Sequence, residues 1–276
     1  MKKEVLLFCV LLPTLLNAQV PDTLAARRSV DSLIRTAASQ FVLKNYIALQ
    51  GTATQLIELA GVLKGKQSEQ VALGYNHLGM AAFHLGDLDL AIRSLEEALR
   101  IRSAIFERKN PMLAITLNSL GLMHARAGHI AATESCFLES IALSRERLGE
   151  RHQDVGYALV HLSNFYHTVG RYKDAEALMI EVKGIWEEAF GPESIQVSII
   201  LGNMGLLART LWHLEEAEQY FLESVRISDK VVKTNHPTRA TNLNNLGILY
   251  IHIGRHREAI PYIEQALQIW EHTGEK

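Results

Sequence analysis

Several features that define large classes of proteins are scarce in this chain of 276 residues. Lys and Arg number 28 against 30 Asp and Glu, so the formal net charge is −2 and no basic excess marks a nucleic-acid-binding face. Beyond the first 20 or so residues, no apolar run reaches the length of about 20 residues that a membrane helix needs. Nucleic acid is therefore not an expected partner, and we expect no membrane span after the N-terminal segment.

The first 18 residues have the layout of a secretory signal peptide. Two lysines precede an apolar run (residues 5–16), and Ala18 suits the position before cleavage. Leu16 is bulkier than the small residue usual there, which leaves an uncleaved N-terminal anchor as the alternative. Cleavage would remove Cys9, one of two cysteines, so the mature chain could form no intramolecular disulfide. We expect a periplasmic or secreted protein whose stability comes from packing.

Patterns that carry enzymatic chemistry are also lacking. The chain has no Gly-x-Ser-x-Gly, no Walker loop, no His-Glu-x-x-His and no dinucleotide fingerprint. Among its 12 histidines, His124/His129 and His252/His256 each lie on either side of a turn, which favours surface or turn residues over a metal site. Cys136 has no recognisable His–acid pair beside it, which favours a partly buried thiol over a nucleophile. We expect no catalytic residue, no metal and no cofactor.

What the chain does contain is a repeat of 42 residues. A small residue after Leu or Met recurs five times, at Gly79, Gly121, Ser163, Gly205 and Gly247. Seven residues further on come Gly86, Gly128, Gly170, Trp212 and Gly254, and twelve residues on come Ala91, Thr133, Ala175, Ala217 and Ala259. Apolar residues recur at helical spacing on both sides of the second position, so each unit is a helix A, a tight turn and a helix B. The first glycine lies inside helix A, where it costs about 1 kcal/mol relative to Ala, so we expect a neighbouring helix to approach it closely.

The period and the helix-start signals predict the element bounds. Asn110-Pro111 and Pro237 mark first turns of helices, and Gly191-Pro192 offers a similar signal. Helix A is predicted over 69–84, 111–126, 153–168, 195–210 and 237–252, and helix B over 88–104, 130–147, 172–190, 214–231 and 256–272. The repeats would span 69–110, 111–152, 153–194, 195–236 and 237–276. Residues 19–68 read as a loose lead (19–27) and a divergent N-terminal helical repeat or cap with two helices over 28–66.

Leu-Gly, Gly and Ala at these offsets, with an aromatic three residues after the first small position (Tyr166, Tyr250), resemble the tetratricopeptide repeat. The ordinary unit has about 34 residues. The longer period, with "LGERHQDV" and "NHPTRATNLNNLGILYIHIGRHREAI", resembles the variant typified by kinesin light chain, and Pro261 early in helix B is similar to that variant too. The resemblance covers residues 69–272. It implies an all-α, right-handed superhelical solenoid of antiparallel helix pairs, with helix A on the concave face, and it is not specific for a partner.

Trp212 departs from the pattern, because it stands where the other repeats have the turn glycine. A bulky residue is unfavourable at positive φ. The sequence therefore predicts another turn geometry, with the indole packed on a neighbour. An exposed aromatic at the edge of a binding surface is the alternative.

Residues beside the packing positions of helix A are expected to line a peptide-binding groove. Asn can donate and accept hydrogen bonds at once, and the resemblance implies that groove asparagines hold the main chain of an extended peptide. Some of them would be structural instead, because Asn also favours helix starts and satisfied buried positions. The expected set is Asn76, Met80, Phe83, His84, Asn118, Leu122, Arg126, Asn164, His167, Leu206, Arg209, Asn244, Ile248 and His252.

We therefore expect an exported, non-enzymatic scaffold or adaptor that binds a peptide or protein segment. The alternative is the sensory or regulatory repeat region of a larger protein, because similar exported chains continue into a caspase-like peptidase, a histidine kinase or a DNA-binding output domain. The last helix motivates this alternative, since no polar capping helix follows its apolar residues Ile260, Ile263, Leu267 and Trp270. A further domain, a partner or a second copy of the chain, forming a homodimer, would cover that edge.

Overall fold

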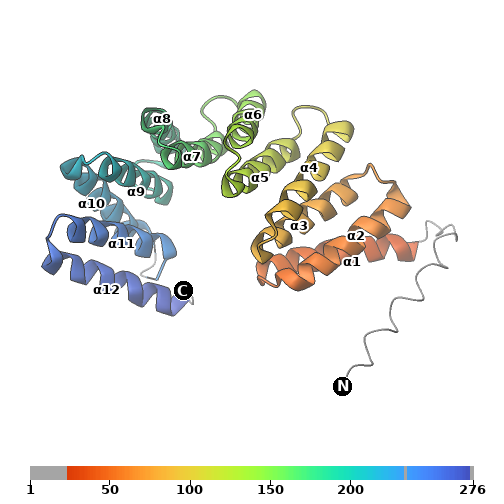
Figure 1. Cartoon of the computed structure of the whole chain (residues 1–276), viewed down its shortest axis with the longest axis horizontal. Coiled ribbons are helices and arrows are strands. Elements are labelled where there is room, and N and C mark those ends of the chain that lie inside the picture. Colours follow the sequence, from red (N-terminus) through yellow and green to blue (C-terminus); the bar gives the residue numbers. More distant parts are fainter. Residues whose placement is uncertain (1–23, 233–234, 274–276) are drawn as a thin grey trace, which may run out of the picture. The chain divides into compact units, whose positions relative to one another are not determined.

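The computed structural model describes residues 24–232 and 235–273 (Figure 1). The predicted signal peptide, residues 1–18, lies outside this part of the chain. Twelve α-helices and no strand occur in the described ranges. The chain divides into two compact units, an N-terminal unit of residues 1–107 and a C-terminal unit of residues 108–276. Within each unit, consecutive helices pack on one another as antiparallel pairs, as expected for an all-α solenoid of helix pairs.

The N-terminal unit contains four helices in its described part. They are α1 (Leu24–Val42), α2 (Tyr46–Lys64), α3 (Glu69–Leu85) and α4 (Leu88–Ile105). The guanidinium of Arg102 is fully buried on α4 and forms a two-pronged ion pair with Glu69 at the start of α3, with Nη2–Oε1 and Nε–Oε2 distances of 2.9 and 3.2 Å. Because α1 begins at Leu24, the loose lead predicted over 19–27 is wrong for its last four residues.

The C-terminal unit contains the helices of four repeats. They are α5 (Pro111–Ala127), α6 (Ile130–Leu148), α7 (Gln153–Thr168), α8 (Tyr172–Phe190), α9 (Ile195–Thr210), α10 (Leu214–Val231), α11 (Pro237–His252) and α12 (His256–Thr273). Every helix predicted from the 42-residue period is present, with ends within one residue of the expected bounds. Each helix B also packs on the helix A that follows it, so the repeats of this unit stack in sequence order.

The helix-start signals are confirmed at two places and wrong at a third. Asn110 Oδ1 accepts a hydrogen bond from Met112 N at 2.9 Å, with Pro111 in the first turn of α5. Pro237 likewise opens α11. Gly191-Pro192, in contrast, does not start a helix, because Gly191 ends α8 at φ +85° and Ser194 caps α9 instead.

The glycines inside helix A lie against helix B of the same repeat, as expected. A Cβ on Gly121 would lie 2.7 Å from the ring of Phe137, and one on Gly205 would lie 2.6 Å from the ring of Phe221. Any side chain there would push the two helices apart. The propensity cost of these glycines is thus offset by close packing within each repeat.

The prediction of another turn geometry at Trp212 is wrong. Trp212 adopts φ +62°, and its turn is held by hydrogen bonds from Trp212 N to Arg209 O and from His213 N to Ala208 O, at 3.1 and 2.9 Å. The turn at Gly254 is closed by the same pair of bonds. The backbone bonds that end helix A therefore impose the left-handed conformation on the bulky residue. The indole is 72 % exposed rather than packed away, and it stacks on His252 with a centroid distance of 5.9 Å.

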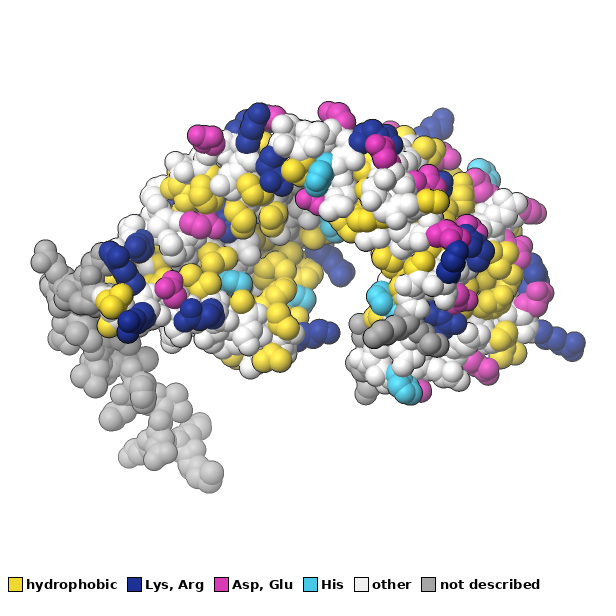
Figure 2. All heavy atoms as spheres, turned by 180° about the vertical axis from the view of Figure 1, so that it is seen from behind, with side chains coloured by type: hydrophobic (Ala, Val, Ile, Leu, Met, Phe, Trp, Pro, Cys, Tyr) yellow, Lys and Arg dark blue, Asp and Glu magenta, His cyan; other side chains and the backbone are white. Residues whose placement is uncertain are grey.

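Charges of both signs are interspersed over the surface drawn in Figure 2, with no region of one sign. Arg226 of α10, for example, pairs with Glu223 of the same helix and with Glu193 in the loop before α9. No helix in the described ranges is both long enough and apolar enough to cross a membrane.

Candidate functional site

Two pockets lie side by side along α5 in the C-terminal unit, and both are lined by α5, α6 and α7. The first has a volume of about 240 Å³ and is lined by Pro111, Ala114, Ile115, Asn118, Ser119, Ser140, Ser144, Arg147, Leu148, Asp154, Tyr157, Ala158 and His161. The second has a volume of about 400 Å³ and is lined by Leu122, Ala125, Gly128, Ile130, Phe137, His161, Asn164, Phe165, Thr168 and Val169. Because His161 lines both, we treat them as one site, the α5–α7 groove.

Helix packing opens this groove. Helices α5 and α7 are the A helices of successive repeats, and α6 lies between them along the chain. Phe137 of α6 reaches the groove because Gly121 of α5 has no side chain in its way. A phenyl ring and the apolar residues around it thus form the wall of the larger pocket. Such a surface suits apolar side chains of a ligand.

Asn118 gives the smaller pocket an unsatisfied acceptor. Its Oδ1 atom is buried and has no hydrogen-bond partner. An acceptor left in this state costs about 1–3 kcal/mol relative to a bonded one. In the N-terminal unit Asn76, which is 42 residues earlier, has an Oδ1 in the same state. The same repeat position thus offers an unused acceptor in both units.

His161 joins the two pockets and is half-buried. Its ring stacks on Phe137 with a centroid distance of 6.1 Å and an interplanar angle of 14°. Burial lowers the pKa of His161 below its usual value of 6.5. The imidazole is therefore neutral at pH 7, and it can donate one hydrogen bond and accept another.

Of the predicted groove residues, Asn118, Leu122 and Asn164 come together in this groove. The exposed Arg126 lies in the last turn of α5, outside both pockets. His167 Nε2 instead lies 2.9 Å from Thr210 Oγ1, and burial, then the charge of Arg209, lowers the pKa of His167.

The predicted residues of α9 and α11 line neither pocket. Leu206, Arg209 and Asn244 are half-buried, and burial lowers the pKa of Arg209. Ile248 is 36 % exposed. His252 is exposed as well, and its ring stacks on the indole of Trp212. Some asparagines were expected to be structural, and Asn242, which is not one of the predicted groove residues, is such a residue. It is buried, and its Nδ2 donates to Ser198 Oγ at 2.7 Å.

The predicted residues of the N-terminal unit lie on α3. Asn76, Met80 and Phe83 are half-buried, and His84 is exposed. The ring of His84 stacks on Tyr46 with a centroid distance of 3.9 Å and an interplanar angle of 8°. Partial burial, then the charge of Lys44, lowers the pKa of His84. His84 therefore contacts the divergent first helix pair.

The groove is also lined by His161, Tyr157 and Arg147, which the repeat pattern did not predict. A signal existed for the first, since His77 occupies the same repeat position two residues before the small residue, and burial lowers the pKa of His77 as well. His124 was expected at the surface or in a turn, but it is buried, with Nδ1 lying 3.1 Å from Nδ1 of His129. No group of three or more His, Cys, Asp or Glu is placed to hold a metal ion in residues 24–232 and 235–273.

Stacked antiparallel helix pairs, a constant period and glycine-mediated helix contacts define a helical-repeat protein. The tetratricopeptide repeat family matches residues 70–146, 154–230 and 213–272. The chain therefore belongs to the tetratricopeptide repeat family.

Solved structures share this fold. BtubC (BKLC) from P. vanneervenii superposes with a TM-score of 0.67 at 17 % identity, over 84 % of this chain and 93 % of that one. The putative kinesin light chain repeats of Podosopora anserina give 0.60 at 18 % identity, over 73 % and 95 %. The Rap conjugation gene regulator of plasmid pLS20, solved with the Phr* peptide, gives 0.63 at 13 % identity, over 89 % and 76 %. The likeness to kinesin light chain repeats is confirmed, and at these identities it concerns the fold alone.

Curated relatives match a shorter segment. The clustered mitochondria protein homolog of Aspergillus fumigatus is 21 % identical over 138 residues, which are 50 % of this chain and 10 % of the relative. The homolog of Emericella nidulans matches similarly over 11 % of its length. The chain thus spans about a tenth of these relatives.

Proposed function

We propose that this chain is a protein-binding repeat scaffold whose α5–α7 groove binds an extended peptide segment of a partner protein. The observation that carries the proposal is the buried, unpartnered Oδ1 of Asn118 in the wall of the smaller pocket. If the Asn118 amide turns toward the pocket, a main-chain N–H of a bound peptide would supply the missing donor. An apolar side chain of the same peptide would enter the larger pocket beside Phe137 and Phe165.

The chemistry of the groove supports a peptide over a charged small molecule. Its two charged lining residues, Arg147 and Asp154, are exposed and opposite in sign. The second asparagine, Asn164, lines the other pocket, so each pocket has one side-chain amide among its apolar lining residues. A fold neighbour of similar architecture, the Rap regulator, was solved with a peptide. The role is non-enzymatic in this proposal, and the scaffold acts after export through its signal peptide.

Selection and mutation would test this function. Random dodecapeptides displayed on phage are selected on the full chain, and the affinity of enriched peptides is measured by fluorescence polarisation. Asn118→Ala and Asn164→Ala should each weaken binding by about tenfold, because each variant loses one hydrogen bond to the bound peptide. Gln219→Ala, at an exposed site on α10, is the matched control and should leave affinity unchanged. Unchanged affinity in both groove variants, with native circular dichroism, would reject the groove as the binding site.

The last helix supports a separate proposal about assembly. Ile260 and Leu267 of α12 are 54 % and 50 % exposed, so these two residues of the predicted apolar edge are accessible. The other two are not, because Ile263 packs against Gly247 and Trp270 packs on the core of the last repeats. We propose that a further domain or a second copy of the chain covers the two accessible residues. Light scattering of the chain distinguishes the two, since a dimer requires the second copy and a strict monomer rejects it.

A further inference from the structure

One junction between repeats of the C-terminal unit is joined by a tyrosine, an arginine and a glutamate. Tyr166 of α7 donates its hydroxyl to Glu134 Oε1 of α6 at 2.6 Å. Arg171 Nη1 donates to the same oxygen at 2.6 Å, and its guanidinium lies 4.0 Å from the centroid of the Tyr166 ring. The carboxylate of helix B thus holds a phenol and a guanidinium from the next repeat.

The same arrangement recurs two repeats further along. Tyr250 donates its hydroxyl to Glu218 Oε1 at 2.9 Å, Arg255 Nη1 donates to that atom at 2.7 Å, and the guanidinium lies 4.3 Å from the ring centroid. Burial, and then the glutamate partner, raises the pKa of Tyr250 to about 12. The repeat scaffold therefore builds this guanidinium-binding position twice, and we call each copy a filled junction.

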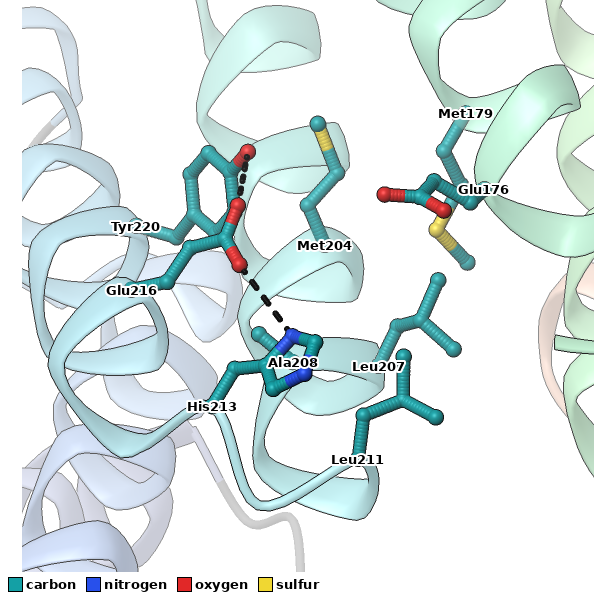
Figure 3. A pocket seen from close by; sticks show the side chains of 9 residues that line it. All are labelled: Glu176, Met179, Met204, Leu207, Ala208, Leu211, His213, Glu216 and Tyr220. Atoms are coloured by element: carbon teal, nitrogen blue, oxygen red, sulfur yellow. Dashed lines mark hydrogen bonds and ion pairs between the residues drawn. The ribbon is translucent and has the colours of Figure 1, made fainter. Parts of the chain in front are cut away.

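The junction between these two keeps the glutamate but lacks both donors. Glu176 of α8 stands 42 residues after Glu134, while Ala208 replaces the tyrosine and His213 replaces the arginine. His213 Nδ1 lies 3.5 Å from Glu216 Oε2, so it contacts the neighbouring carboxylate. Glu176 is exposed, and the absent phenol leaves an open pocket beside it (Figure 3).

The pocket is acidic at its rim and apolar at its floor. Glu176 and Glu216 face it from α8 and α10, and the Tyr220 hydroxyl donates to Glu216 Oε1 at 3.1 Å. Met179 and Met204 contribute to the floor. The free space is about 20 Å³, room for one water. Methionine side chains adapt readily, so this floor can yield to an entering group.

We propose that this open junction, the Glu176 pocket, binds the guanidinium of an arginine side chain from a partner protein. The two filled junctions show the ligand chemistry, because the equivalent carboxylate holds a guanidinium in both. A planar guanidinium offers several donors in a fixed geometry, which allows it to reach both Glu176 and Glu216. The aliphatic stem of the same side chain would lie on the methionines and leucines of the floor. The site is formed by α8, α9 and α10 and does not depend on the α5–α7 groove.

A small probe tests the chemistry directly. N-acetyl-arginine amide is titrated into the full chain and followed by NMR chemical-shift changes, with N-acetyl-citrulline amide as the uncharged probe of the same shape. Arginine should bind saturably, and Glu176→Gln should weaken it by about tenfold because one charge-assisted bond is lost. Glu264→Gln, at an exposed site on α12, is the matched control and should bind as the parent chain does. Equal binding of citrulline, no saturable binding of arginine, or unchanged binding to Glu176→Gln would overturn the proposal.

Rebuilding the filled junction gives a second, independent test. The double variant A208Y/H213R restores the two residues that the pocket lacks, so its own guanidinium should occupy Glu176. We expect a higher melting temperature than that of the parent chain and a loss of arginine binding of at least about tenfold. Undiminished arginine binding in this variant would show that the probe binds elsewhere.

Discussion

The filled junctions and the open junction of the C-terminal unit use the same carboxylate position for different purposes. At Glu134 and Glu218 the partners come from the chain itself, and the bonds tie one repeat to the next. At Glu176 two substitutions, to alanine and to histidine, remove those partners without altering the helix bounds around them. A repeat scaffold can therefore turn an internal contact into an exposed site by changing two side chains.

Opening a filled junction should have the largest effect on stability. Tyr250 is 4 % exposed, so Tyr250→Ala creates a cavity and also leaves Glu218 and Arg255 without the phenol. We expect a loss of about 3 kcal/mol in the free energy of unfolding, measured by urea denaturation. Tyr250→Phe retains the ring and should lose only about 1 kcal/mol. Equal losses for the two variants would mean that the hydroxyl, and not ring packing, secures the junction.

A glycine in the turn next to the open junction should stabilise the protein. Trp212 is held at φ +62°, a conformation in which a non-glycine residue is strained. Trp212→Gly should therefore raise the free energy of unfolding by about 1 kcal/mol in the same assay. The converse change at the glycine turn, Gly254→Ala, should lower it by a similar amount. A destabilised Trp212→Gly protein would show instead that stacking on His252 outweighs the backbone strain.

Acid should weaken the hydrogen bonds of a filled junction. Of the three changes considered, this one should have the smallest effect on the free energy of unfolding. The Tyr166 hydrogen bond, and then the one from Arg171, lowers the pKa of Glu134 below its usual 4.5. A carboxylate with a lowered pKa contributes stability above about pH 4.5, and this contribution is lost as the pH falls through the folded-state value. Urea denaturation between pH 6 and pH 3.5 should show a shallower decline for Glu134→Gln than for the parent chain. Identical pH dependence in the two proteins would contradict an ionised Glu134 at this junction.

Local signals in the sequence were enough to place the helices. Turn glycines recur with the period in four of five repeats, and Asn110-Pro111 and Pro237 mark two helix starts. Each of these signals acts within a few residues, so the period extends their positions to the other helix ends. The turn geometry at Trp212 was predicted wrongly because hydrogen bonds to the backbone of the preceding helix set its conformation, whatever its side chain prefers. His161 was missed because only the packing of α5, α6 and α7 shows that it borders two pockets.

The open junction could not be predicted from the sequence, for a related reason. Glu176 and its equivalents can be aligned from the period alone. The tyrosine and arginine that meet Glu134, however, lie 32 and 37 residues away, and nothing local indicates that they converge on one oxygen. Hydrogen bonding in the structure likewise distinguishes Asn118, whose buried Oδ1 has no partner, from Asn242, whose Nδ2 donates to Ser198 Oγ.

Hydrogen–deuterium exchange of the full chain, with and without a selected peptide, tests the proposed groove most directly. If the peptide lies in the α5–α7 groove, amides of α5 and α7 should exchange more slowly in its presence, while those of α10 and α12 should be unaffected. Protection confined to α10 and α12, with α5 and α7 unchanged, would contradict peptide binding in this groove.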